Sequence, residues 1–73
     1  MRQVRMSQRT FGRRTKREIR ELVPTACGYK STANGAKIIT DGDGQTVATW
    51  HAPQLSFARY RDGLNMGALL VIR

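Results

Sequence analysis

The apolar residues of this chain follow a helical period first and a strand period later. Behind the stretch Thr15 to Glu18, which fits a helix capping box, apolar residues recur at the spacing i, i+3, i+4, i+7. The positions that predict this buried helical face are Ile19, Leu22, Val23 and Ala26. Because Pro24 cannot continue a regular helix, we expect a helix over residues 15–23, with an extension to 27 at most.

Three short segments after this helix are typical of β-strands separated by tight turns. They cover residues 29–33, 36–40 and 45–51. Between the first two, Asn34-Gly35 is the sequence expected of a two-residue type I′ hairpin, in which both positions need positive φ. The stretch from Asp41 to Gly44 predicts the second reversal, so the three segments indicate an antiparallel meander.

The last third of the chain is expected to add a second helix and an apolar tail. Pro53 closes the meander, and residues 54–62 place apolar side chains at helical spacing. The tail, residues 67–73, is too short for its period to distinguish a strand from a helix end. We therefore expect a single small α+β domain built as helix, three-stranded antiparallel meander and helix, with both helices on one sheet face.

The positive charge gathers at one end of the chain, whose formal net charge is +8. Residues 1–21 hold eight of the 13 lysines and arginines but two of the five carboxylates. This asymmetry divides the chain into a basic N-terminal arm, residues 1–14, and a folded domain, residues 15–73. Arginines spaced three and four residues apart predict an arm that becomes helical only against a polyanion. These arginines are Arg2, Arg5, Arg9 and Arg13.

Clustered cations without matching carboxylates are the pattern expected of a surface that contacts nucleic-acid phosphates. Ten of the 13 cations are arginine, whose planar guanidinium can bind one phosphate through two hydrogen bonds. Aromatic rings on which single-stranded bases could stack are Phe11, Tyr29, Trp50 and Tyr60, although core packing explains Trp50 and Tyr60 more simply. The residues expected to contact nucleic acid are Arg2, Arg5, Arg9, Arg13, Arg14, Lys16, Arg17, Arg20, Lys37 and Trp50.

The chain has few groups that transfer protons or hold metals. His51, at the expected end of the third strand, is the single histidine and the one candidate for general acid–base catalysis. Cys27 is the single cysteine, which we expect to be a small buried residue rather than a reactive thiol. One Cys and one His do not complete a zinc site, and the Asp41–Gly44 stretch lacks the later ligands of a calcium loop. We therefore expect no metal and no cofactor.

The order of elements and three local stretches resemble the HicA-like family of small RNA-directed toxins, whose fold is a variation on the double-stranded-RNA-binding fold. "TKREIRELV" is similar to the first helix of that family, "ANGAKIITDGDGQTVATWHAP" to its central hairpin and "LSFARYRDGL" to its last helix. The family's catalytic histidine follows the glycine at the start of the second hairpin strand, where this chain has Ala36 or Lys37. The resemblance thus implies an RNA-binding surface without the ribonuclease activity. Short Arg-rich chains of this kind also resemble phage-encoded, host-directed proteins.

These patterns predict a small basic protein that binds nucleic acid, RNA before DNA, without catalysis by this chain. One alternative is a module that inhibits an acidic host protein, steered by the basic arm and anchored by the apolar tail Leu69–Ile72. Another is a ribonuclease that uses His51. A homodimer would form through the tail or an open sheet edge. No apolar stretch is long enough to span a membrane, so we expect a soluble cytoplasmic protein.

Overall fold

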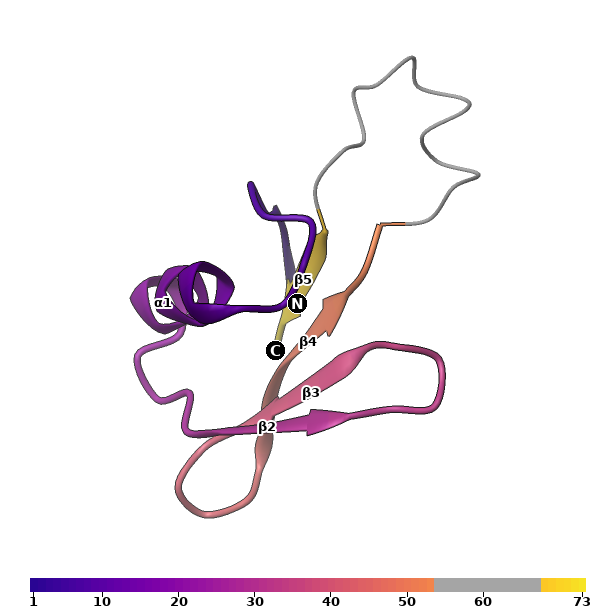
Figure 1. Ribbon diagram of the computed structural model, residues 1–73. Helices are drawn as coiled ribbons and strands as arrows, with labels where there is room; N and C mark the ends of the chain where they lie inside the picture. The colour runs from indigo at the N-terminus through magenta and orange to yellow at the C-terminus, as the bar shows by residue number, and fades with distance from the viewer. Residues whose placement is uncertain (54–67) are drawn as a thin grey trace.

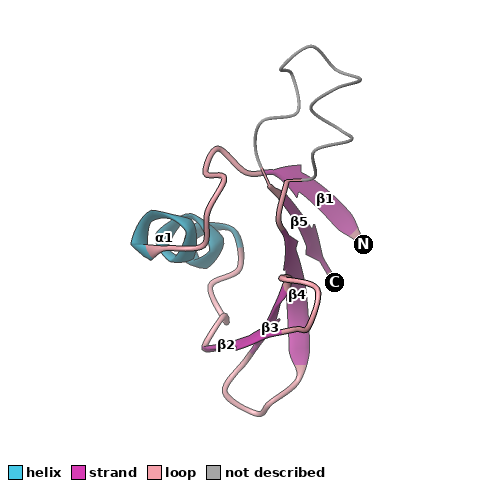
Figure 2. Cartoon of the chain, turned by 45° about the vertical axis from the view of Figure 1, so that its right-hand side comes forward, coloured by secondary structure: helices cyan, strands magenta, loops and turns pink. Residues whose placement is uncertain are grey.

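In the part of the chain that the computed structural model describes, five antiparallel strands form one sheet, and one helix lies against one of its faces (Figures 1 and 2). The structure describes residues 1–53 and 68–73. The strands follow one another across the sheet in the order β1-β5-β4-β3-β2. In chain order the elements are β1 (Arg2–Arg5), α1 (Arg13–Leu22), β2 (Gly28–Ser31), β3 (Lys37–Thr40), β4 (Thr46–His51) and β5 (Leu69–Ile72).

The α+β class and the central meander are confirmed, whereas the expected order of helix, meander and helix is wrong. Strands β2, β3 and β4 pair consecutively, as the alternation predicted. Two further strands, β1 and β5, complete the sheet beside β4. The tail is therefore a strand, and it lies between two neighbours. The helix expected over residues 54–62 falls outside the described part of the chain.

The first hairpin closes with a three-residue loop instead of the expected two-residue type I′ turn. The amide of Thr32 donates to the carbonyl of Ala36 at 2.9 Å, and the amide of Gly35 donates to the carbonyl of Thr32 at 3.1 Å. Gly35 has φ +87°, which is the left-handed position that ends a three-residue loop. The amide of Ala36 also donates to the hydroxyl of Thr32 at 3.1 Å, and this side-chain acceptor stabilises the wider loop.

The N-terminal residues form a strand rather than a conditional helix. Strand β1 pairs along β5, so that Val4 lies opposite Leu70, and Val4 packs against the core. Beyond the strand, the amide of Met6 donates to the carbonyl of Ala68 at 2.7 Å, and the Met6 side chain is only 1% exposed. The expected helix is absent because β5 offers these residues a free edge with backbone partners, which a lone arm lacks.

Helix α1 begins two residues earlier than its sequence predicts, because Thr15 is not its cap. Gly12 takes the N-cap position without a side-chain hydrogen bond. Thr15 instead faces the core, 1% exposed, and its hydroxyl donates to the carbonyl of Thr10 at 2.5 Å. Glu18, the other half of the expected capping box, accepts a hydrogen bond from the Ser7 hydroxyl at 3.1 Å. The expected end is confirmed, since α1 stops at Leu22, before Pro24.

The core lies between α1 and the sheet face that it covers (Figure 2). Ile19 of α1, Ile39 of β3 and Leu70 of β5 are fully buried there. Trp50 is 3% exposed and lies opposite Leu70 in the pairing of β4 with β5. Ile19, Val23 and Ala26 are buried as expected, but Val23 caps α1 and Ala26 lies beyond its end, while Leu22 is half-buried against the core. This packing fixes the rotation of α1 over the sheet.

Candidate nucleic-acid interface

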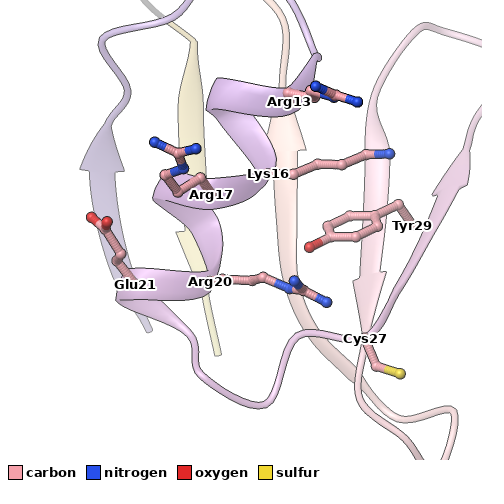
Figure 3. A pocket seen from close by; sticks show the side chains of 7 residues that line it. All are labelled: Arg13, Lys16, Arg17, Arg20, Glu21, Cys27 and Tyr29. Carbon is pink, nitrogen blue, oxygen red and sulfur yellow. The ribbon is translucent and has the colours of Figure 1, made fainter.

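A groove with a basic wall runs between α1 and the edge strand β2 (Figure 3). We name it the α1–β2 groove, and its volume is about 800 Å³. Its lining is Arg13, Lys16, Arg17, Arg20 and Glu21 from α1, Cys27 before β2 and Tyr29 of β2. Four cations against one carboxylate make this groove a candidate site for an anionic ligand.

The rotation of α1 gathers these cations at one side of the helix. Thr15 and Ile19 point into the core, and this direction fixes where every other side chain of α1 lies. Arg13, Lys16, Arg17 and Arg20 follow the spacing i, i+3, i+4, i+7, which places them along one stripe. On the opposite flank, Glu18 is held by Ser7. The helix therefore presents a basic flank to the groove and a mixed-charge flank away from it.

The cations of this stripe keep their charge uncompensated. No ion pair holds Arg13, Lys16, Arg17 or Arg20 within residues 1–53 and 68–73. Arg13 also occupies the first turn of α1, where there is no acidic residue. A cation at that end is opposed by the helix macrodipole, whereas an anion there is favoured. Both the guanidinium groups and the helix backbone therefore favour a negative ligand at this end of the groove.

Tyr29 forms the aromatic wall of the groove. It lies opposite Ile39 in the pairing of β2 with β3, and this register turns its ring toward α1. The Lys16 ammonium lies 5.3 Å from the Tyr29 ring centroid, and the Phe11 ring meets Tyr29 edge-on at 5.5 Å. The Tyr29 hydroxyl is buried and has no hydrogen-bond partner among the described residues, although the residue as a whole is half-buried.

Lys37 extends the positive charge beyond the groove lining onto the sheet. Its ammonium lies 5.5 Å from the Phe11 ring centroid and donates a hydrogen bond to the Ser31 hydroxyl at 2.5 Å. The Lys16 ammonium lies 5.9 Å from the same ring centroid. Phe11 therefore holds cations from two elements, α1 and β3, close to one another.

The remaining residues expected to contact nucleic acid are dispersed. Arg2 and Arg5 belong to β1, at the opposite edge of the sheet from β2. Arg9 lies in the segment before α1, and Arg14 is on α1 outside the groove lining; both are exposed. Trp50 lies in the core, where its 3% exposure leaves no ring face for stacking on a base. The described structure thus brings together Arg13, Lys16, Arg17 and Arg20, with Lys37 beside them at Phe11, and leaves the other predicted residues outside this group.

The groups considered for catalysis and metal binding do not meet in the groove. His51 is exposed at the end of β4, and it pairs with Leu69 on the sheet face opposite α1. The Asp41 carboxylate accepts hydrogen bonds from the amides of Asp43 and Gln45, at 2.8 and 3.0 Å, as a turn residue does. Within the described ranges, no three His, Cys, Asp or Glu residues lie together as metal ligands.

Sequence reasoning missed two groove residues. Cys27 was expected to be buried, but it is exposed and lines the groove. Its place follows from the backbone, where its amide donates to the carbonyl of Thr40 at 2.7 Å and begins the pairing of β2 with β3. Glu21 was not among the residues expected to contact nucleic acid, but it also lines the groove. The helical spacing of the cations from Arg13 to Arg20 can be read from the sequence. The preceding arginines have a similar spacing, however, so the sequence does not distinguish the groove cations from them.

Comparisons of the chain with protein-family models, with curated proteins and with solved structures found no match. The resemblance to the HicA-like family therefore stays a prediction from the sequence. None of the described helices is long and apolar enough to cross a membrane.

Proposed function

We propose that this chain is a small nucleic-acid-binding protein that holds backbone phosphates in the α1–β2 groove and performs no catalysis itself. The observation that carries the proposal is the stripe of Arg13, Lys16, Arg17 and Arg20 along one groove wall. Phosphate contact requires cations that converge on one surface, and the energetic gain comes from the counterions that they release. RNA is the first expectation among nucleic acids, because the sequence resembles an RNA-directed family.

The charge balance of the groove supports a polyanion over a small neutral ligand. Among the described residues, Glu21 is the single carboxylate of the lining, and it stands at the opposite end of α1 from Arg13. Arginine forks bind phosphate oxygens in pairs, and Lys16 adds a point charge between them. A strand that follows the groove would meet these cations in succession. We therefore expect about four phosphate contacts.

No observation in the described residues favours the alternative of a protein-binding inhibitor. That alternative needs an apolar tail free to anchor a partner. Leu70 is fully buried, and both edges of β5 are already paired, with β1 and with β4. A catalytic role for His51 likewise finds no support in the groove, because His51 lies on the other sheet face. Phosphate binding remains the function that the geometry supports best.

The test is a titration of labelled RNA and DNA oligonucleotides with the protein at several salt concentrations. Four phosphate contacts predict a slope of log affinity against log salt of about −2.8 for a single strand to −3.6 for duplex DNA. Arg17→Gln and Arg20→Gln should each weaken binding and reduce the steepness of that slope by about 0.7 to 0.9. A slope near zero for the unaltered protein would overturn the proposal.

Arg14→Gln is the matched control for these variants. It removes the same charge from the same helix, but Arg14 does not line the groove. We expect its affinity and its salt slope to stay close to those of the unaltered protein. If Arg14→Gln weakened binding as much as Arg20→Gln does, the contact would be a general effect of net charge and the groove would not be the site.

A further inference from the structure

We propose that the α1–β2 groove takes single-stranded rather than double-stranded nucleic acid, with one base stacked on the ring of Tyr29. This inference rests on the proposed function and specifies its ligand. Basic grooves that carry an aromatic side chain are the usual means by which proteins hold single strands, because every base has a face that can stack. Tyr29 is the one aromatic residue of the groove lining within residues 1–53 and 68–73.

The first step is that the ring of Tyr29, and not its hydroxyl, is the part a ligand can reach. The side chain is half-buried, yet its hydroxyl oxygen is fully covered. The exposed area therefore belongs to the rest of the residue, which lines the groove. Figure 3 shows the ring between the side chains of Lys16 and Arg20, with the hydroxyl directed toward α1. A base would contact the ring carbons in place of the Lys16 ammonium, which lies 5.3 Å from the ring centroid, and no hydrogen bond to the hydroxyl is required.

The second step is that this ring is held in place before any ligand arrives. Phe11 meets it edge-on at 5.5 Å with an interplanar angle of 61°. Phe11 in turn meets the buried Trp50 at 5.2 Å, so the ring is connected to the core through a chain of aromatic contacts. A ring fixed in this way loses little conformational freedom when a base stacks on it. Stacking on Tyr29 therefore costs little ordering entropy.

The third step concerns which nucleic acid can supply both a base and phosphates to this groove. In a duplex the bases are stacked on one another and their faces are not available to a side chain. A single strand can turn one base toward Tyr29 while its phosphates follow Arg13, Arg17 and Arg20. A duplex could offer its phosphates to these cations but no free base face to Tyr29. The aromatic wall thus adds affinity for the single strand alone.

The experiment compares the affinities of the full chain for a single strand and for the duplex of the same sequence, in RNA and in DNA. We expect tighter binding of the single strand. Tyr29→Leu should then lose roughly 5- to 100-fold in single-strand affinity, since base stacking on an aromatic ring is lost. Its salt slope should stay unchanged, because no charge is removed. The RNA and DNA arms establish which strand is preferred.

Tyr29→Phe is the matched control, because it keeps the ring and removes a hydroxyl that has no partner. We expect its single-strand affinity to stay within about twofold of the unaltered protein. Equal or tighter binding of the duplex would overturn the inference, and so would full affinity in a folded Tyr29→Leu variant. If Tyr29→Leu does not fold, the comparison of strand and duplex decides alone. Absence of any salt-dependent binding would instead overturn the proposed function.

Discussion

The ammonium group of Lys16 on α1 lies 5.3 Å from the ring centroid of Tyr29 on β2. A cation over an aromatic face at a partly exposed site contributes about 0.5–1 kcal/mol. This contact joins the helix to the strand at the free edge of the sheet, across the mouth of the α1–β2 groove. In this pair, Lys16 contributes one of the positive charges of the groove and Tyr29 forms its aromatic wall.

The buried hydroxyl of Tyr29 predicts an unusual effect on stability. A buried hydroxyl without a partner costs about 1–3 kcal/mol, so its removal costs the fold nothing. We expect Tyr29→Phe to leave the free energy of unfolding unchanged or to raise it by about 1 kcal/mol. Urea denaturation followed by circular dichroism measures this. A decrease of about 1 kcal/mol or more would show that the hydroxyl has a partner in solution.

The strand at the N-terminus predicts that Val4 is a core contact. Val4 packs against the core, whereas Gln3, its neighbour in β1, is exposed. Val4→Asp should lower the free energy of unfolding by about 2 kcal/mol, because a carboxylate would displace an apolar side chain from a half-buried site. Gln3→Asp, which introduces the same charge one residue away, should change it by at most about 0.5 kcal/mol. Equal effects of the two variants in urea denaturation would argue against β1.

The second hairpin turn predicts a difference between two neighbouring glycines. Gly44 has φ +83°, a conformation that L-residues rarely adopt, and its amide donates to the carbonyl of Asp41 at 3.1 Å. Gly44→Ala should therefore cost about 1–2 kcal/mol of stability. A methyl group added at Gly42 would meet no atom within 4 Å, so Gly42→Ala should cost at most about 0.5 kcal/mol. Thermal unfolding of the two variants tests this, and a reversed order would contradict the loop geometry.

The exposed thiol of Cys27 predicts rapid labelling of the native protein. A small water-soluble thiol reagent should react with the folded chain at a rate close to that of the denatured chain. Because Cys27 lines the groove, a bulky label there should also weaken oligonucleotide binding, while Cys27→Ser binds normally. Mass spectrometry measures the labelling rate. A thiol that reacts only after denaturation would show that the segment before β2 is packed differently.

Structural features that depend only on residues close together in the chain could be predicted from the sequence. The burial of Ile19, Val23 and Ala26 follows from their spacing, and the end of α1 follows from the missing amide of Pro24. The hairpin loops follow from glycines that tolerate positive φ, at Gly35 and Gly44. The proposed class of ligand, an anion, rests on the excess of arginine and lysine. Each of these properties is set within a few residues.

The remaining features required the tertiary structure. The segment Arg2–Arg5 has a single apolar residue and the positive charge expected of the basic arm. It becomes a strand only because β5, at the other end of the chain, supplies its backbone hydrogen-bond partners. The groove likewise depends on packing. The spacing of the cations on α1 is local, but their approach to Tyr29 follows from Thr15 and Ile19 entering the core and fixing the helix rotation. Local sequence determines which residues share a face, whereas burial of the common core decides which faces meet.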